Sequence, residues 1–251
     1  MIIAFEGVDG TFKQTNANML SEYIKKRYKT DKVIVASFPD YNSQSSFLLR
    51  SYFSKIKAHK ELSPEMISNL FFLDFYYSWW TKLHELNSNN YIIIADRWWY
   101  SNIYYQGTRK ILQSNETVRY SLPLFDEYAE NCIDVATKEF GLPHADYVIK
   151  MEHNLIKPGK SYEDRESDGY DINEDDIKYM MSVDEVFRYF DFDRICKGST
   201  TIRLDESFTN PKDKFDIFTD IFNYLEETLD EFVRENKISY IQEGPSDWFY
   251  R

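Results

Sequence analysis

Residues 1–24 read MIIAFEGVDGTFKQTNANMLSEYI, and this stretch decides how the rest of the chain is interpreted. A short apolar run at residues 2–5 is broken by Gly7 and Gly10, and apolar side chains at helical spacing follow over residues 19–24. A strand, a tight loop and a helix in this order are typical of the first unit of an α/β protein.

Four more apolar runs predict strands, at residues 33–38, 91–95, 147–151 and 200–204. The segments between them predict helices at about 44–56, 64–87, 121–139, 174–197 and 211–236. Strands joined by helical crossovers form parallel sheets that are covered on both faces. We therefore expect an α/β, three-layer fold with a five-stranded, mostly parallel sheet, built as one domain over residues 1–251. The polar stretch 153–175 is expected to be a solvated loop or a lid.

The composition argues against polyanion-binding proteins. The 251 residues carry 30 Lys and Arg against 42 Asp and Glu, a formal net charge of −12, which would repel nucleic acid and anionic membranes. Cys132 and Cys196 lie far apart, so neither a disulfide framework nor a zinc site is indicated. Without a recognisable leader or a long apolar segment, the chain is expected to be a cytoplasmic protein.

The loop after the first strand, GVDGTFKQT at residues 7–15, resembles a phosphate-binding loop with two departures. Lys13 is in register, but Phe12 stands where the last glycine belongs and Gln14 where the hydroxyl belongs. A left-handed backbone at Phe12 would cost roughly 1–2 kcal/mol. Thr15 could supply the displaced hydroxyl. A purely structural turn is the alternative, but the position between a strand and a helix favours phosphate binding.

A second group of polar residues follows the third predicted strand, in ADRWWYSNIYYQG at residues 95–107. Asp96 and Arg97 come at the carboxyl end of that strand, where ligands bind in open α/β sheets. Ser101, Tyr105 and Gln106 follow at helical spacing. Arg97 offers a two-pronged donor for a phosphate. An ordinary surface ion pair is the alternative for Asp96 and Arg97, but we favour a functional role.

Together, these motifs resemble the thymidylate kinase family of P-loop nucleoside monophosphate kinases over most of residues 1–205. The resemblance rests also on Phe38-Pro39, on LFFLD at 70–74, on GLP at 141–143 and on Asp164-Arg165 in the polar stretch. It implies a P-loop NTPase-type fold, ATP and Mg²⁺ as cofactors, and phosphorylation of dTMP to dTDP. It also implies small-molecule nucleotides as ligands and a homodimer.

The resemblance assigns a role to each matching residue. The ATP phosphates would bind Gly7, Val8, Asp9, Gly10, Thr11, Phe12, Lys13, Gln14 and Thr15. The catalytic groups would be Lys13, Asp96, Arg97 and Arg165, the last on a lid at about 153–175. The acceptor nucleotide would contact Asp9, Phe38, Phe71 or Phe72, Phe75, Arg97, Ser101, Tyr105 and Gln106. Magnesium would be held by Thr15 and Asp96, directly or through water. Beyond the matching residues, residues 237–251 are expected to form a C-terminal extension.

Two positions depart from the family pattern in the acceptor region. Asp40 and Tyr41 stand where an arginine usually follows Phe-Pro, and Phe75 stands where an arginine usually follows the aspartate of the aromatic segment. The acceptor base is therefore left open between thymine and another pyrimidine. Two other functions also stay open: a nucleotide-binding homologue with impaired catalysis, and a deoxynucleoside kinase with Asp96 or Glu6 as the base.

Overall fold

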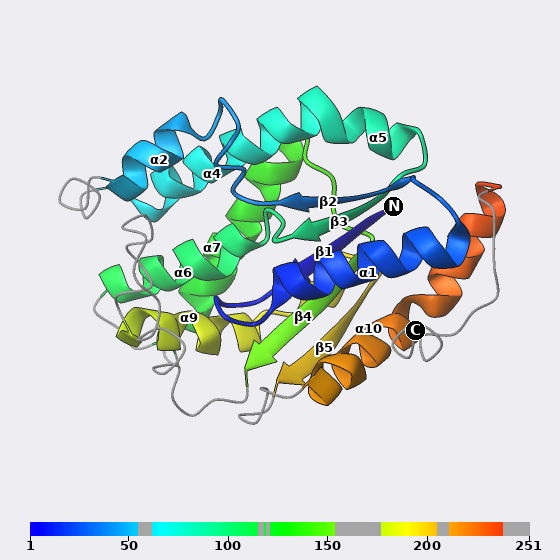
Figure 1. The fold of residues 1–251 in the computed structure, drawn as a ribbon. Coiled ribbons are helices and arrows are strands. Elements are labelled where there is room, and N and C mark those ends of the chain that lie inside the picture. Colours follow the sequence, from blue (N-terminus) through cyan, green and yellow to red (C-terminus); the bar gives the residue numbers. More distant parts are fainter. Residues whose placement is uncertain (55–61, 115–117, 119–120, 154–176, 205–210, 238–251) are drawn as a thin grey trace.

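A computed structural model describes residues 1–54, 62–114, 118, 121–153, 177–204 and 211–237 (Figure 1). Its five strands are β1 (Ile2–Glu6), β2 (Val33–Ser37), β3 (Ile92–Asp96), β4 (Tyr147–His153) and β5 (Gly198–Leu204). They form one sheet in the order β2-β3-β1-β4-β5, and every neighbouring pair is parallel. The prediction of a five-stranded, mostly parallel sheet is confirmed.

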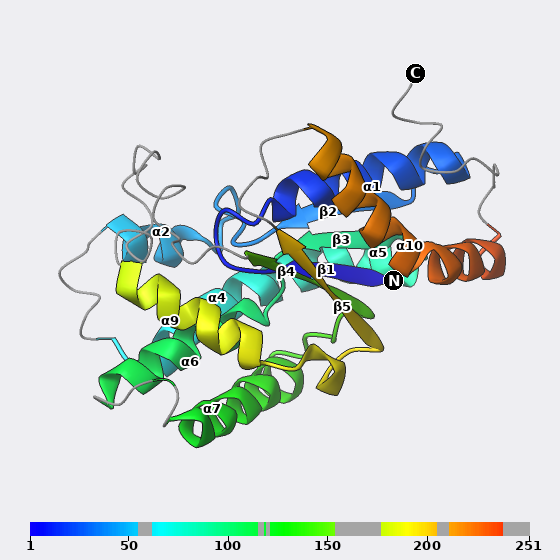
Figure 2. The same ribbon diagram turned by 90° about the horizontal axis from the view of Figure 1, so that it is seen from below.

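Helices connect the strands and cover both faces of the sheet. They are α1 (Lys13–Tyr28), α2 (Phe47–Ser54), α4 (Pro64–Ser78), the π-helical turn η1 (Trp79–Leu83), α5 (His84–Ser88), α6 (Ser101–Gln113), α7 (Leu122–Asp134), the π-helical turn η3 (Val135–Glu139), α9 (Ile177–Tyr189), the short 3₁₀ turn η4 (Phe192–Arg194) and α10 (Pro211–Glu235). Helices α1 and α10 cover one face, and α4, α6, α7 and α9 cover the other (Figure 2).

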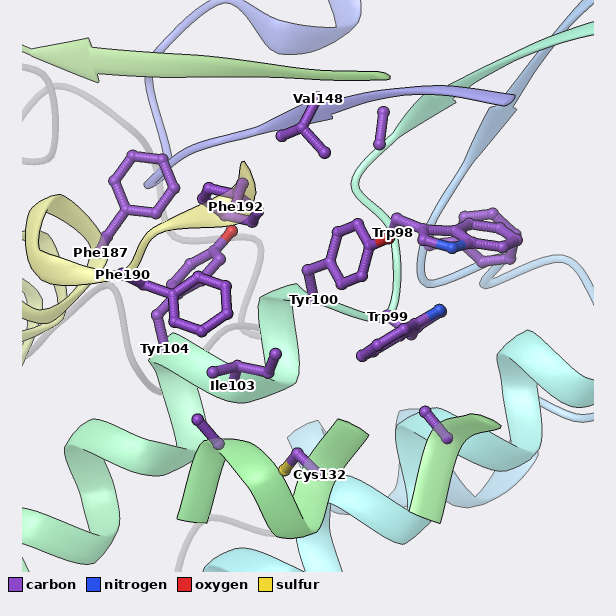
Figure 3. Close-up of a cluster of buried hydrophobic side chains, with 14 of the residues drawn as sticks. Trp98, Trp99, Tyr100, Ile103, Tyr104, Cys132, Val148, Phe187, Phe190 and Phe192 are labelled. Carbon is purple, nitrogen blue, oxygen red and sulfur yellow. The ribbon is translucent and has the colours of Figure 1, made fainter. Parts of the chain in front are cut away.

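Alternating residues of β1 explain these three layers. Ile2 and Ala4 face the core under α4, α6, α7 and α9, whereas Ile3 and Phe5 face the core under α1 and α10. Aromatic side chains make up much of the first core, and Figure 3 shows Trp98, Trp99 and Tyr100 together with the rings of α6 and α9 in this layer. Aromatic residues make up 18% of the sequence, and many of them serve the packing around α6.

The helix predictions hold with two exceptions. The predicted helix 64–87 starts as expected, because Ser63 accepts a hydrogen bond from the N–H of Met66 at 3.1 Å and Pro64 is its first residue. The predicted helix 174–197 is wrong beyond Tyr189, where Phe190 and Phe192 turn into the core. Helix α6 was not predicted as a separate element.

Two predicted regions fall largely outside the described residues. The first is the predicted lid at 153–175, of which only residue 153 is described, so Arg165 lies outside the described residues. The second is the extension at 237–251, of which only residue 237 is described. Across the described ranges, none of the helices has the length and apolarity that a membrane crossing requires.

Candidate active site

The candidate site lies where β1 and β3 end side by side. Phe5 of β1 is in register with Asp96 of β3, so the loop after β1 and the turn after β3 leave the same edge of the sheet. Gly7 follows β1 directly, and a Cβ atom there would lie 2.5 Å from the carbonyl oxygen of Met151 in β4. Only glycine allows the loop to pass so close to the neighbouring strand.

The first of two cavities at this edge, here called the loop cavity, opens at the start of α1. It is lined by Asp9, Gly10, Phe12, Lys13, Gln14, Thr15, Asp96 and Arg97. The amino end of a helix carries partial positive charge and suits a phosphate group. The other three residues predicted to bind ATP, Gly7, Val8 and Thr11, are not part of this lining, and the Thr11 hydroxyl donates a hydrogen bond to the Val8 carbonyl at 2.8 Å.

Phe12 adopts the left-handed conformation that the loop pattern predicts for a glycine, with φ of 57° and ψ of 26°. Its carbonyl accepts two hydrogen bonds from Asn16, one from the backbone N–H at 3.0 Å and one from the side-chain amide at 2.9 Å. Its ring packs against the core under α1 and α10. At this position the backbone therefore keeps the conformation expected of the missing glycine, and these contacts offset the cost of that conformation.

Lys13 is buried inside the loop. Its ammonium group donates hydrogen bonds to the Val8 carbonyl at 2.7 Å and to the Thr11 hydroxyl at 3.1 Å. Burial, followed by the positive charge of Arg97, lowers the pKa of Lys13 from 10.5 to about 7. A phosphate in the loop cavity would provide the negative charge that favours the protonated amine.

Arg97 and Asp9 form an ion pair at the boundary of the loop cavity. The Arg97 guanidinium also donates to the Gly7 carbonyl at 3.1 Å and lies over the ring of Tyr105, 5.4 Å from its centre. Burial alone would lower the pKa of Arg97, but the carboxylate of Asp9 raises it well above its ordinary value. The φ of Arg97 is 68°, so its backbone turns sharply after β3 and aims the side chain at the loop.

A second cavity, here called the aromatic cavity, adjoins the loop cavity and has a volume of about 220 Å³. It is lined by Asp9, Phe38, Pro39, Tyr41, Phe53, Phe71, Phe75, Arg97, Ser101, Asn102, Tyr105 and Gln106. The two cavities share Asp9 and Arg97. A ligand in the aromatic cavity with an anionic group at Arg97 would therefore face a ligand in the loop cavity.

Most of the residues predicted to contact an acceptor nucleotide come together here. Of the alternatives Phe71 and Phe72, only Phe71 lines the aromatic cavity, whereas Phe72 is 1% exposed and packs against Phe140 in the core. Phe75 lines the cavity and stacks on Phe38, with ring centres 4.4 Å apart. The Phe38-Pro39 peptide bond is cis.

Two amide side chains of α6 lie in the aromatic cavity. Gln106 is 2% exposed, and its carbonyl oxygen has no hydrogen-bond partner among the described residues. Asn102 is 3% exposed, and its side-chain N–H group lies 3.5 Å from the Ser68 carbonyl. A buried carbonyl without a partner costs stability, so a bound ligand with an N–H group would satisfy Gln106.

Glu6 is a site residue that sequence reasoning considered only as a base. It is fully buried, and it accepts hydrogen bonds from the Trp98 N–H at 2.7 Å, the Ser101 hydroxyl at 2.8 Å and the Tyr104 hydroxyl at 2.7 Å. Burial raises its pKa from 4.5 to about 7, against the effect of these bonds. Glu6 thus connects the end of β1 to the first turn of α6.

Asp74 is a second residue whose role the sequence did not reveal. It is fully buried and accepts hydrogen bonds from the Asp40 N–H at 2.9 Å and from the hydroxyls of Ser43 and Ser45 at 2.9 and 2.7 Å. Burial raises its pKa. Asp74 therefore holds the 40–45 segment, including Tyr41, against the aromatic cavity.

The donor set of the loop cavity fits ATP phosphates and magnesium. Lys13, Arg97 and the start of α1 offer positive charge, while the Asp96 carboxylate and the Thr15 hydroxyl offer oxygen ligands. Mg²⁺ takes one or two carboxylates and fills its other positions with water and phosphate oxygens. Among the described residues, no group of three His, Cys, Asp or Glu is placed to hold a metal by itself.

Comparison with known proteins gives one consistent result. A family profile described as "Thymidylate kinase" matches residues 5–128. The chain is 28% identical over 175 residues to a probable thymidylate kinase of Methanosphaera stadtmanae, covering 62% of this chain and 88% of that protein. It is 34% identical over 112 residues to a probable thymidylate kinase of Archaeoglobus fulgidus, covering 44% of this chain and 52% of that protein. The fold is similar to that of the Candida albicans thymidylate kinase, with a TM-score of 0.65, 18% identity and coverage of 90% and 91%.

Proposed function

Since the chain belongs to the thymidylate kinase family, we propose that it transfers the γ-phosphoryl group of ATP to a deoxynucleoside 5′-monophosphate, with dTMP as the default acceptor. The observation that carries this proposal is that the loop cavity and the aromatic cavity share Arg97 and Asp9. A nucleoside monophosphate kinase has to bring the phosphate of its acceptor next to the γ-phosphate of ATP, and a charged pair shared by two cavities suits that arrangement.

The described residues divide the work in a simple way. Lys13 and the start of α1 would hold the ATP phosphates, and Arg97 would hold the acceptor phosphate next to them. Asp96 and Thr15 would hold magnesium, which when bound neutralises phosphate charge. Phe71 would stack on the base. Catalysis by positioning and charge needs no general base, because the acceptor phosphate is already an anion.

The geometry favours a monophosphate acceptor over a nucleoside acceptor. A deoxynucleoside kinase needs a carboxylate base near the acceptor hydroxyl. Glu6 is satisfied by three donors and does not line the aromatic cavity, and Asp96 lines only the loop cavity. Asp9 lines the aromatic cavity, but it is paired with Arg97. None of these three carboxylates is placed as a base there.

An ADP-release assay over deoxynucleosides and their 5′-monophosphates tests the proposal. We expect turnover with dTMP and none with thymidine. Arg97→Ala should lower kcat/KM for the acceptor at least 100-fold, whereas Arg234→Ala near the end of α10 is the matched control and should leave it unchanged. Binding of ATP without turnover of any monophosphate would identify the chain as the impaired homologue that Phe12 and Gln14 allow.

We propose further that the whole chain forms one kinase domain and acts as a cytoplasmic homodimer. One sheet collects all five described strands, which supports the single domain. Exposed apolar side chains at helical spacing on one side of α4 and η1 support self-association: Met66, Leu73, Tyr77 and Trp80. Cys132 and Cys196 are free thiols, as a reducing compartment permits. Sedimentation of the wild type and of Leu73→Glu tests the dimer, because the charged variant should shift towards the monomer.

A further inference from the structure

The polar groups of the aromatic cavity include a charged pair and two side-chain amides. Arg97 and Asp9 mark the end shared with the loop cavity, where the proposed function places the acceptor phosphate. Gln106 comes five residues after Ser101, the first residue of α6, which is ~7.5 Å along the helix axis. A nucleotide that holds its phosphate at Arg97 would therefore extend its base towards the amides of Asn102 and Gln106.

Two hydroxyl groups that line this cavity are engaged elsewhere. The Ser101 hydroxyl donates to Glu6 at 2.8 Å, and the Tyr105 hydroxyl lies 3.4 Å from Asp9 and points to the phosphate end. Among the described residues that line the cavity, the one cationic side chain is Arg97. Beside the amides, the cavity walls are aromatic and come from Phe38, Phe53, Phe71 and Phe75.

An amide reads a pyrimidine differently from a cation. A 4-oxo pyrimidine presents an acceptor at position 4 and a donor at N3, and a 4-amino pyrimidine presents the reverse pattern. A side-chain amide has one carbonyl and one NH₂ group, and a half-turn about its last bond exchanges their places. A lysine or arginine in this place could only donate, and it would reject the 4-amino base.

We infer that this kinase phosphorylates 4-amino and 4-oxo pyrimidine deoxynucleotides alike, with Gln106 as the residue that reads either base. The carbonyl oxygen of Gln106, which has no hydrogen-bond partner within the part of the chain that the structure describes, accepts from N3–H of a 4-oxo base or from the 4-amino group. The NH₂ group of Gln106 meets the other atom of the pair. The 4-amino substrate class adds a cytidylate-type activity to the thymidylate-type activity. The inference rests on the proposed function, because that function places the base at α6.

The matched substrates are dUMP and dCMP, which differ only at N3 and position 4. We expect their kcat/KM values to lie within tenfold of each other. If the enzyme turns over dTMP but prefers dUMP to dCMP by more than tenfold, the inference is overturned while the proposed function stands. Calorimetric Kd values for the two nucleotides provide a readout without turnover. If neither is phosphorylated but both bind within tenfold of each other, the recognition is upheld and the kinase function fails. If neither nucleotide binds, both fail.

Gln106→Ala identifies the reading residue. It should lower kcat/KM for dUMP and dCMP by at least tenfold each through the KM for the acceptor, with the KM for ATP changed less than twofold. Gln113→Ala, on the exposed side of the same helix, is the matched control. A loss of less than threefold for both nucleotides in Gln106→Ala, or an equal rise in the KM for ATP, would overturn the assignment.

Discussion

Replacing Glu6 by glutamine should change how stability depends on pH. In the folded chain, burial raises the pKa of this carboxyl from 4.5 to about 7. A raised pKa means that the folded state favours the protonated form, so this contribution to stability is fully present below pH 4.5 and is lost as the pH rises through about 7. The rise of the Glu6 pKa from 4.5 to about 7 corresponds to ~3 kcal/mol in the free energy of unfolding.

Glutamine keeps the shape of the side chain and removes the titration. Its carbonyl can still accept from the Trp98 N–H, and its NH₂ group can donate to the hydroxyls of Ser101 and Tyr104, which also accept hydrogen bonds. The stability of the wild type relative to Glu6→Gln should therefore fall by ~3 kcal/mol between pH 5 and pH 8. Glu6→Ala, by contrast, removes the acceptor of the buried Trp98 N–H, and a buried donor left unpaired costs ~1–3 kcal/mol. The hydroxyls of Ser101 and Tyr104 lie 2.9 Å apart and can still pair with one another.

Urea unfolding of both proteins at pH 5, 6, 7 and 8 measures the difference. Contributions from other titrating groups are present in both proteins and largely cancel. For Lys13, the charge of Glu6 is the last of the named causes of its pKa shift, behind burial and the charges of Arg97, Asp9 and Asp96. Glu85→Gln, an exposed glutamate on α5, is the matched control for the chemical change. Two unfolding free-energy curves that stay parallel within ~1 kcal/mol from pH 5 to pH 8 would refute the reasoning, because Glu6 would then carry its charge in the core without a net cost.

Three further predictions concern the loop and the packing of α6. At position 12, glycine adopts a left-handed backbone without a steric cost, whereas alanine does not, so Phe12→Ala should be less stable in urea than Phe12→Gly by ~1–2 kcal/mol. Equal stabilities of the two variants would contradict backbone strain at this position. Lys13→Met should lower kcat/KM at least 100-fold, yet raise the melting temperature at pH 7. Burial lowers the pKa of Lys13 from 10.5 to about 7, so the buried amine destabilises the folded state at pH 7, and this destabilisation disappears only as the pH rises towards 10.5. A Cβ atom at Gly107 would lie 2.8 Å from the ring of Phe125. Gly107→Ala should therefore lower the free energy of unfolding by ~1–3 kcal/mol in a thermal melt, although alanine has the better helix propensity. An unchanged Tm would show that α6 and α7 can move apart.

The fold could be predicted because its signals are local. Each strand is a short apolar run between polar or glycine-containing segments, and the register of β1 with β3 follows once both runs are known. Helix α6 was missed as an element although Ile103, Tyr104 and Ile111 are spaced for a buried helix face. Gly107 interrupts that pattern, and its reason, the ring of Phe125, comes from a different helix.

The end of α9 shows the limit of periodicity. Phe190 and Phe192 extend the apolar pattern beyond Tyr189, which predicted a longer helix. In the structure both rings are buried against one another, 5.0 Å apart, and the Asp191 carboxylate accepts the Asp193 N–H to start a 3₁₀ turn. Buried side chains on both sides of one backbone turn cannot be distinguished from a helix face by spacing alone.

The roles within the site depend on contacts between distant residues. The loop pattern singled out Phe12 as the position where a left-handed backbone would be costly, because a missing glycine is visible in a single motif, and the structure has a φ of 57° there. Glu6 has its hydrogen-bond partners more than ninety residues away, so only the assembled sheet and α6 reveal its network. Asp74 likewise binds a segment about thirty residues earlier in the chain. No signal in the sequence marks these carboxylates as buried.

The ion pair between Arg97 and Asp9 makes binding an exchange of partners. Without a nucleotide, the carboxylate satisfies the guanidinium, which is mostly buried and already bonded to the Gly7 carbonyl. An acceptor phosphate must compete with Asp9 for Arg97, so the affinity reflects the difference between two charge-assisted contacts rather than the strength of one. Since Asp9 and Arg97 line both cavities, any shift of Asp9 also alters the loop cavity in which Lys13 lies. Occupancy of the aromatic cavity is therefore coupled to the arrangement of charge around the ATP phosphates.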